Sequence, residues 1–261
     1  LRIIPSSGFA LINGDDANLA DLLPVTWTQV IRVGTQEDNE LQIRNFQDAP
    51  TGAQFELVWQ GQLWAQVRWS MHGLFNARNA AMAALAAALA SGHQDPRNFD
   101  LSPLAQFAGV RRRQDVLYSN DQWTVLEDFA HHPTAVAGAI EALRAAYPER
   151  SMTVCFEPRS NTAATSRFQV EFESALSQAD RVYFGAVHRS ERMRPEERLD
   201  TAAMAASLSI QGVEAAAFTS NEAVFEALQA QLGAQTAGVV VFLTNGSFDG
   251  LPRRTAALFE D

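Results

Sequence analysis

The feature that most constrains this chain is a regular alternation of apolar runs and helical patterns after about residue 113. The apolar runs lie at 123–127, 152–156, 181–187, 213–218 and 238–244, and the helical patterns lie near 134–146, 166–178, 200–208, 221–233 and 252–260. Parallel strands need a long crossover, usually a helix, so this rhythm is typical of a parallel sheet. We therefore predict an α/β fold whose C-terminal part is a Rossmann-like, doubly wound and mostly parallel sheet of about five or six strands.

The region before this alternation carries β-type signals up to about residue 70. The run GFALINGDD closes at the Asn13-Gly14 turn signal, and AQFELVWQGQLWAQVRW alternates on both sides of Gln60-Gly61, which predicts an antiparallel hairpin. The stretch NARNAAMAALAAALASGH then predicts a helix that ends at Gly92. We expect the domain boundary near GVRRRQ, with one domain over residues 1–113 and a second over residues 114–261.

Charge and cysteine content narrow the class of protein. The 261 residues carry a net charge of −10, which argues against non-specific binding to nucleic acid or anionic lipid. The one cysteine, Cys155, precludes an internal disulfide and suits a reducing compartment. No apolar run approaches the roughly 18 residues that span a bilayer, and no signal peptide is recognisable. We expect a cytoplasmic protein and, because the opening at Leu1 reads as mid-fold sequence, a fragment of a longer one.

Polar residues follow several of the predicted strands. Asp128, His131 and His132 come after the first strand, EPRSNT (157–162) after the second and TNGSFDG (244–250) after the last. In doubly wound sheets, ligands bind at the carboxyl ends of the strands. We therefore predict one functional site at this edge of the sheet.

Two groups of polar residues outside these loops allow alternative interpretations. Asn76 and Asn79, three apart at the start of the alanine-rich helix, share a face and offer donors and acceptors suited to a nucleotide base, or they only cap and solvate the helix. GVRRR (109–113) places three guanidinium groups in a row, which suits phosphate or carboxylate, or it is a solvated linker. Successive side chains point in different directions, so we expect one of the three to face a ligand.

The run EDFAHHPT suggests a metal site, but its spacing does not support one. Adjacent histidines diverge, and there is no H-E-x-x-H spacing and no cysteine partner, so we expect no metal ligands among the candidate residues. A carboxylate at a strand end instead suits a ribose hydroxyl or the orientation of a magnesium shell. Arg159 can clamp a substrate carboxylate, with Ser160 and Asn161 as further contacts or as a helix cap. No segment has the spacing of a phosphate loop or of a G-x-G-x-x-G fingerprint.

Taken in order, the motifs resemble those of the Mur ligases, the ATP-dependent amide-forming enzymes of bacterial cell-wall synthesis. GLFNARNAA resembles the family's G-x-H-N-x-x-N-A-x-A with Phe75 in place of the usual His, FAGVRRRQ resembles the end of the central domain, and EDFAHHPT resembles D-D-Y-x-H-H-P. The resemblance covers essentially the whole chain and implies the second half of a central ATP-binding domain followed by the C-terminal domain.

Two further motifs select within the family. FEPRSNT and TNGSFDGL resemble the members that, in peptidoglycan recycling, join UDP-N-acetylmuramate to L-alanyl-γ-D-glutamyl-meso-diaminopimelate. The L-alanine-adding members carry P-H-R-Y-T-R where this chain has FEPRSNT. The resemblance therefore implies UDP-N-acetylmuramate and the tripeptide as substrates.

The resemblance also implies ATP and Mg²⁺ as cofactors and assigns residues to the nucleotide. Asn76 and Asn79 fall where the family contacts adenine. Arg113 matches its nucleotide-contacting arginine, and Asp128 matches its ribose-binding aspartate. The chain lacks the family's phosphate loop and its magnesium-binding acid, so we expect that it does not turn over ATP by itself.

The same resemblance assigns the catalytic and substrate-binding residues. In the family mechanism, ATP phosphorylates the muramoyl carboxylate, and the free amine of the peptide then displaces phosphate through a tetrahedral intermediate. His131, with Asp128, is the expected catalytic residue and lies near the incoming nucleophile. Arg159 is expected to meet a carboxylate of the tripeptide, with Ser160 and Asn161 beside it.

Three other interpretations remain open. A UDP-N-acetylmuramate–L-alanine ligase performs the same chemistry on a free amino acid. A Rossmann-type oxidoreductase predicts a glycine fingerprint after the first strand, which EDFAHHP lacks. A non-catalytic peptide-binding module predicts affinity for the tripeptide without any need for ATP.

Overall fold

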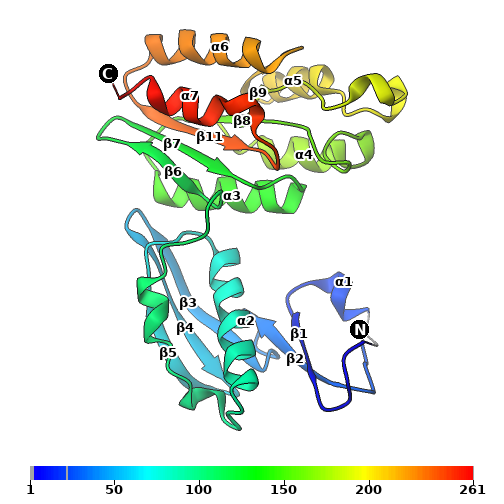
Figure 1. The fold of residues 1–261 in the computed structure, drawn as a ribbon, viewed down its shortest axis with the longest axis vertical. Helices are drawn as coiled ribbons and strands as arrows, with labels where there is room; N and C mark the ends of the chain where they lie inside the picture. Colours follow the sequence, from blue (N-terminus) through cyan, green and yellow to red (C-terminus); the bar gives the residue numbers. More distant parts are fainter. Residues whose placement is uncertain (1–2, 22, 261) are drawn as a thin grey trace. The chain divides into compact units, whose positions relative to one another are not determined.

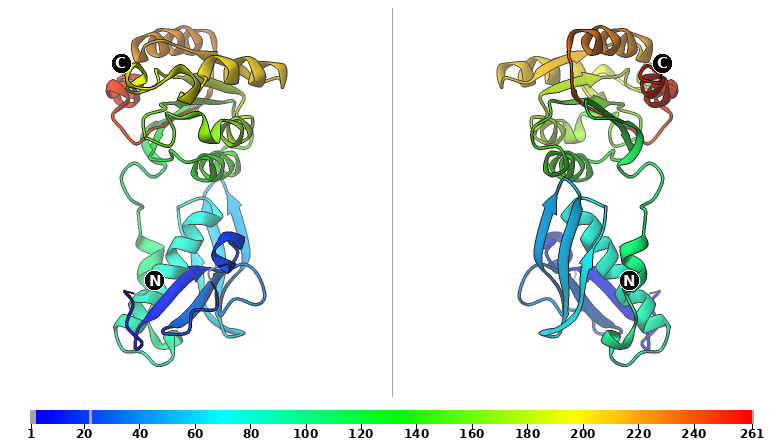
Figure 2. Two further views of the ribbon diagram at one scale, coloured as in Figure 1. Left: turned by 90° about the vertical axis from the view of Figure 1, so that its right-hand side faces the viewer. Right: turned by 90° about the vertical axis from the view of Figure 1, so that its left-hand side faces the viewer.

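The computed structural model describes residues 3–21 and 23–260. The chain forms two compact units, Leu1–Ala108 and Gly109–Asp261, named unit 1 and unit 2 (Figures 1 and 2). The units therefore divide between Ala108 and Gly109, five residues before the boundary after residue 113 that the sequence suggested. Among the described residues, no helix is both long enough and apolar enough to cross a membrane.

Unit 1 is a five-stranded sheet covered by one long helix. Its main elements are β1 (Phe9–Asn13), α1 (Ala17–Ala20), β2 (Gln29–Gly34), β3 (Leu41–Ala49), β4 (Gly52–Trp59), β5 (Gln62–Arg68) and α2 (Leu74–Ala90). The strands lie in the order β1-β2-β3-β4-β5, with parallel β1–β2 and β2–β3 pairs and antiparallel β3–β4 and β4–β5 pairs. Alternate side chains of β3 and β4, including Leu41, Phe55 and Leu57, form one core with Ala77 and Leu85 of α2.

The predicted hairpin is confirmed and its turn residues explain it. β4 and β5 pair antiparallel, with Trp59 opposite Gln62. Gln60 and Gly61 both have positive φ, 46° and 81°, as a two-residue hairpin loop with the twist of its strands requires. The helix α2 also forms as predicted, and the chain leaves it through Gly92, whose φ is 78°.

The segment after β1 is held by one carboxylate, that of Asp15. Its oxygens accept the backbone N–H of Thr35 at 2.8 Å and of Gln36 at 3.2 Å, the Asn39 amide at 3.1 Å and the Arg78 guanidinium at 2.8 Å. Burial alone would raise the pKa of Asp15, but these hydrogen bonds outweigh it and lower the pKa to about 2. Asp15 thereby ties the end of β1 to the β2–β3 connection and to α2.

We predict that Asp15→Asn lowers the thermal stability of the chain at pH 7. A carboxylate whose pKa is lowered on folding stabilises the protein above its ordinary value of 3.8, and this contribution is lost as the pH falls toward 2. The partly solvated site limits the effect to about 1 kcal/mol. Calorimetry should therefore show a difference in unfolding temperature at pH 7 that narrows below pH 4. The exposed Asp121, replaced in the same way, is the control, and a pH-independent difference would contradict the assignment.

Unit 2 is a six-stranded sheet with helices on both faces. Its main elements are β6 (Asp115–Ser119), β7 (Trp123–Asp128), α3 (Pro133–Ala146), β8 (Met152–Phe156), α4 (Gln169–Leu176), β9 (Arg181–Phe184), α5 (Thr201–Ile210), β10 (Glu214–Ala217), α6 (Asn221–Ala234), β11 (Gly238–Leu243) and α7 (Leu251–Ala257). The strand order is β10-β9-β8-β11-β7-β6, and every pair is parallel except β6–β7. The predicted α/β class and doubly wound, mostly parallel sheet are confirmed.

The two faces of the unit 2 sheet bury separate cores, as a doubly wound sheet requires. One core joins alternate strand residues such as Val154 and Val241 to α3, α4 and α5, and the other joins Val125 and Phe242 to α6 and α7. Cys155 is fully buried in the second core, and burial raises the pKa of its thiol. The residues between the central strands and the helices are therefore fixed by packing from both sides.

Candidate functional site

The strand β11 lies between β7 and β8 and so brings together the loops that carry the candidate site of unit 2. It pairs in parallel with both (Figure 1), and in the register of these pairs Leu243 stands opposite Asp128 on one side and Phe156 on the other. The chain segments that leave these three strands therefore emerge at the same edge of the sheet. This confirms that the sequence motifs EDFAHHPT, FEPRSNT and TNGSFDG lie at one edge.

Asp128 is a buried carboxylate whose hydrogen bonds are already engaged. Asp128 is only 3% exposed, and its carboxylate accepts the backbone N–H of Ala130 at 2.7 Å and of Gln114 at 2.9 Å. Burial raises the pKa of Asp128, although the two N–H groups and the positive charge of Arg113 partly oppose the rise. Asp128 therefore fastens the segment before β6 to the loop after β7.

The hydrogen bond that His131 makes gives its two ring nitrogens different roles. Its Nδ1 lies 2.8 Å from the carbonyl oxygen of Phe129, and since a carbonyl only accepts, Nδ1 is the protonated nitrogen of the neutral ring. The ring is half-buried and packs edge-on against Phe129. The remaining nitrogen, Nε2, has its lone pair available to accept a proton.

The middle arginine of the triplet, Arg112, makes structural contacts with neighbouring loops. Arg112 donates to the carbonyl of Thr244 at 3.0 Å and to that of Gly246, and its Nε lies 3.9 Å from a carboxylate oxygen of Glu127. Its backbone has a positive φ of 61°, which turns the chain at this point. Arg112 therefore joins the segment before β6 to the loop after β11.

Arg113 is the member of the triplet that the structure leaves exposed beside the site. Its guanidinium carbon lies 5.3 Å from the centre of the Phe129 ring, and its charge acts on Asp128. Arg111 is also exposed. Within the described residues, no contact of Arg111 with Phe129 or Asp128 is recorded. Of the three, Arg113 is the exposed guanidinium whose charge acts on Asp128, and its role in facing a ligand stays a prediction.

The acidic residue of FEPRSNT was missed by the sequence analysis. Glu157 is 2% exposed, accepts the hydroxyl of Thr244 and lies 3.5 Å from the guanidinium of Arg159. Arg159 itself is half-buried, and its side chain lies over the α-carbon of Gly246. An acid directly after a fully buried strand was the available signal, since such an acid has to find partners.

Ser160 and Asn161 differ in what they can offer. Ser160 Oγ accepts the N–H of Ala163 at 2.9 Å and closes a turn, while its hydroxyl hydrogen remains able to donate. Asn161 is exposed. Neither caps the next helix, because α4 begins at Gln169 with Phe168 as its N-cap.

The two candidate asparagines lie in unit 1 and are unlike each other. Asn76 is 7% exposed, and its amide donates to the carbonyl of His72 at 2.8 Å, whereas Asn79 is exposed. Gly73, not Asn76, is the N-cap of α2, so the capping interpretation of Asn76 is wrong. The Nδ1 of His72 is in turn 2.7 Å from Asp48, whose other oxygen accepts the Gly73 N–H.

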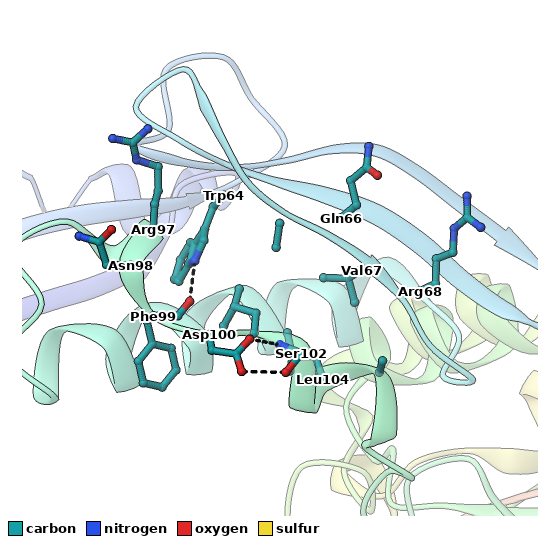
Figure 3. A pocket seen from close by; sticks show the side chains of 13 residues that line it. Trp64, Gln66, Val67, Arg68, Arg97, Asn98, Phe99, Asp100, Ser102 and Leu104 are labelled. Atoms are coloured by element: carbon teal, nitrogen blue, oxygen red, sulfur yellow. Dashed lines mark hydrogen bonds between the residues drawn. The ribbon is translucent and has the colours of Figure 1, made fainter.

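A hollow of about 340 Å³ in unit 1 contains none of these residues (Figure 3). Several of its polar groups already have partners: the Trp64 indole donates to the carbonyl of Phe99 at 3.2 Å, and Asp100 accepts from Ser102. Arg97 is likewise held by hydrogen bonds to a neighbouring aspartate. We therefore assign no site to this hollow.

The metal-ligating side chains of the described residues do not gather into a metal site. Across residues 3–21 and 23–260, no group of three or more histidine, cysteine, aspartate or glutamate side chains is arranged to hold a metal ion. Asp128 and Glu157, the buried acids at the strand ends of unit 2, are instead engaged with N–H, hydroxyl and guanidinium donors.

Comparison with known proteins gives matches over both units. Residues 112–246 match the family described as Mur ligase, glutamate ligase domain, and residues 2–88 match the Mur ligase middle domain. A UDP-N-acetylmuramate–L-alanine ligase of Acidithiobacillus ferrooxidans is 34% identical over 187 residues, which is 70% of this chain and 39% of the relative. One from a Psychrobacter species is 31% identical over 216 residues, 81% of this chain and 44% of the relative. The chain thus spans less than half the length of these two curated relatives.

Solved structures share the fold over nearly the whole chain. The UDP-N-acetylmuramate–alanine ligase of Thermotoga maritima gives a TM-score of 0.71 at 18% identity, over 96% of this chain and 51% of that one. A murein peptide ligase of Psychrobacter arcticus gives 0.68 at 23% identity, over 98% and 52%. A MurF ligase of Thermotoga maritima solved with ADP gives 0.68 at 18%, over 96% and 53%.

We predict that Arg112→Ala destabilises the chain while Arg111→Ala does not. Loss of Arg112 removes two hydrogen bonds to carbonyls of the β11 loop and an ion pair, which should cost about 1–3 kcal/mol. Arg111, its exposed neighbour of identical chemistry, should change stability by less than about 0.5 kcal/mol. Calorimetric unfolding of the three proteins measures this. Equal unfolding temperatures for both variants would contradict the structural role of Arg112.

Proposed function

This chain belongs to the Mur ligase family, and from this premise we propose that it forms part of an ATP-dependent ligase that joins UDP-N-acetylmuramate to L-alanyl-γ-D-glutamyl-meso-diaminopimelate. The observation that carries the proposal is the setting of Arg159 at the carboxyl ends of β8 and β11, over Gly246 and beside Glu157. A guanidinium held by its neighbours is suited to receive a carboxylate through two parallel N–H bonds. The tripeptide offers such carboxylates at its far end.

For ATP binding, we propose different roles for Arg113 and Asp128. The exposed guanidinium of Arg113 would meet phosphate or ribose oxygens of ATP. Asp128 is nearly buried, so it would act mainly by holding Gln114 and Ala130 and would reach a ribose hydroxyl only through the lone pairs that those bonds leave. Asn76 and Asn79 are proposed to contact adenine from unit 1.

In the proposed reaction, His131 accepts the proton that the attacking amine loses. ATP would transfer its γ-phosphoryl group to the muramoyl carboxylate, forming an acyl phosphate. As the peptide amine attacks the acyl carbon, a C–N bond forms, the nitrogen sheds a proton and phosphate leaves. In the neutral tautomer that the Nδ1–H bond to the Phe129 carbonyl favours, Nε2 of His131 carries the lone pair, and we propose that it accepts this proton. Magnesium is proposed from the family alone, and no step here is assigned to it.

A second candidate is a UDP-N-acetylmuramate–L-alanine ligase. It is favoured by the names of the two curated relatives described above, which are 34% and 31% identical. It would use a free amino acid as the nucleophile, with no distant carboxylate for an extended site. The sequence FEPRSNT, with Arg159 in place of that subfamily's histidine, favours the tripeptide instead.

We predict that the 261-residue chain binds the tripeptide and that Arg159→Ala weakens this binding about 10- to 100-fold. The expected loss is that of a hydrogen-bonded charge pair. Isothermal calorimetry measures it, with the exposed Arg167→Ala as a matched control and L-alanine as the competing ligand. Tighter binding of L-alanine than of the tripeptide would favour the second candidate. Equal affinity of Arg159→Ala and the unaltered chain would contradict the role of Arg159.

We predict that this chain alone does not turn over ATP. All 20 of its basic residues are arginine, so it supplies no phosphate-loop lysine, and no G-K-[ST] run is present. The measurement is inorganic phosphate release in the presence of ATP, Mg²⁺, UDP-N-acetylmuramate and the tripeptide. The positive control is the same assay on an intact Mur ligase. Phosphate release that depends on both ATP and tripeptide would overturn this prediction.

A further inference from the structure

The loop after β11 contains a glycine whose missing side chain leaves room for Arg159. A β-carbon built on Gly246 would lie 2.2 Å from Cδ, 2.4 Å from Nε and 2.9 Å from Cζ of Arg159. All three contacts are far shorter than a van der Waals approach, so a methyl group and this arginine position are mutually exclusive. The side chain of Arg159 therefore lies where any residue except glycine would place its own.

The backbone of Gly246 does not itself require glycine. Its φ is outside the positive range that side chains disfavour, unlike that of the nearby Gly250. The atoms that alanine would displace are the far end of a flexible side chain, so the fold has no reason to fail. The three nearest atoms that a β-carbon at this position would meet all belong to Arg159.

On its other side, the Arg159 guanidinium lies next to a connected set of buried hydrogen bonds. Glu157 lies 3.5 Å from Arg159 Nη1, and its second oxygen accepts the hydroxyl of Thr244. Thr244 Oγ1 also accepts the N–H of Gly246 at 2.8 Å, and Glu157 N donates to the Leu243 carbonyl at 3.0 Å. The acid and the glycine are thus parts of one hydrogen-bonded corner between β8 and β11.

We propose that Gly246 and Glu157 are positioning residues that determine specificity: the bare α-carbon seats the Arg159 guanidinium, the buried carboxylate orients it, and together they fix where a substrate carboxylate is received. The choice of ligand rests on the function proposed above. A side chain at 246 would move the guanidinium away from this corner, and the site would lose its preference for a ligand with a carboxylate at that distance. A ligand that lacks this carboxylate would be unaffected.

The test is a double-mutant cycle between Gly246→Ala and Arg159→Ala in the 261-residue chain. We expect Gly246→Ala to weaken tripeptide binding about five- to tenfold when Arg159 is present and less than about twofold when it is absent, because the glycine acts only through the arginine. Glu157→Gln should likewise weaken tripeptide binding only when Arg159 is present. The amide N–H groups of the glutamine would face the guanidinium, which is itself a donor. A Gly246→Ala effect that is the same in both backgrounds would overturn the proposal.

A second readout needs no ligand. The Nε–Hε signal of Arg159 in a ¹⁵N spectrum, assigned by its absence in Arg159→Ala, should shift in Gly246→Ala, while the thermal unfolding temperature should stay within the range of surface substitutions. An unmoved signal would overturn the proposal even if tripeptide binding changes. If the unaltered chain binds no tripeptide, the proposed function fails by itself, and the arginine signal still decides whether Gly246 positions Arg159.

Discussion

The placement of β11 between β7 and β8 is the constraint on which the site of unit 2 depends. Because both pairs are parallel and share Leu243 as a register point, Thr244 can donate its N–H to the carbonyl of Asp128 and its hydroxyl to Glu157. These contacts join residues that are far apart in the chain. Buried polar groups cost free energy unless they are paired, so the pairing fixes the loops as firmly as the apolar core fixes the strands.

Much of this architecture could be predicted from the sequence, because it depends on periodic signals. The alternating strands and helices of unit 2 and the hairpin at Gln60-Gly61 follow from pattern and turn chemistry alone. Two details had no such signal. The antiparallel edge strand β6 is half-exposed and short, and β9 ends at Phe184 although its apolar run continues to residue 187. Strand ends depend on which partner the backbone finds, and a single run of residues does not encode that.

The candidate site was less predictable, because neighbouring residues of one type have different roles. Arg111, Arg112 and Arg113 are chemically identical, yet only Arg112 is turned by a positive φ toward the carbonyls of the β11 loop. Asn76 and Asn79 are one helical turn apart, yet one is buried and the other exposed. Spacing predicts which residues share a region, and tertiary contacts decide which of them remain free to bind. Whether the asparagines and the unit 2 residues meet one nucleotide stays a prediction.

The charge distribution limits how the chain can bind anionic substrates. The ligands proposed above, namely a nucleotide, a muramic acid and a peptide with several carboxylates, are anions, and a net charge of −10 would repel them at long range. Attraction must therefore come from a few cations whose charge is not already neutralised. Among the described residues, Arg112 is paired with Glu127 and with carbonyls, Arg113 is exposed, and the ion pair recorded for Arg159 is the 3.5 Å contact to Glu157. Guanidinium groups stay charged at every physiological pH, so the geometry of these two arginines, more than their protonation, has to control what binds.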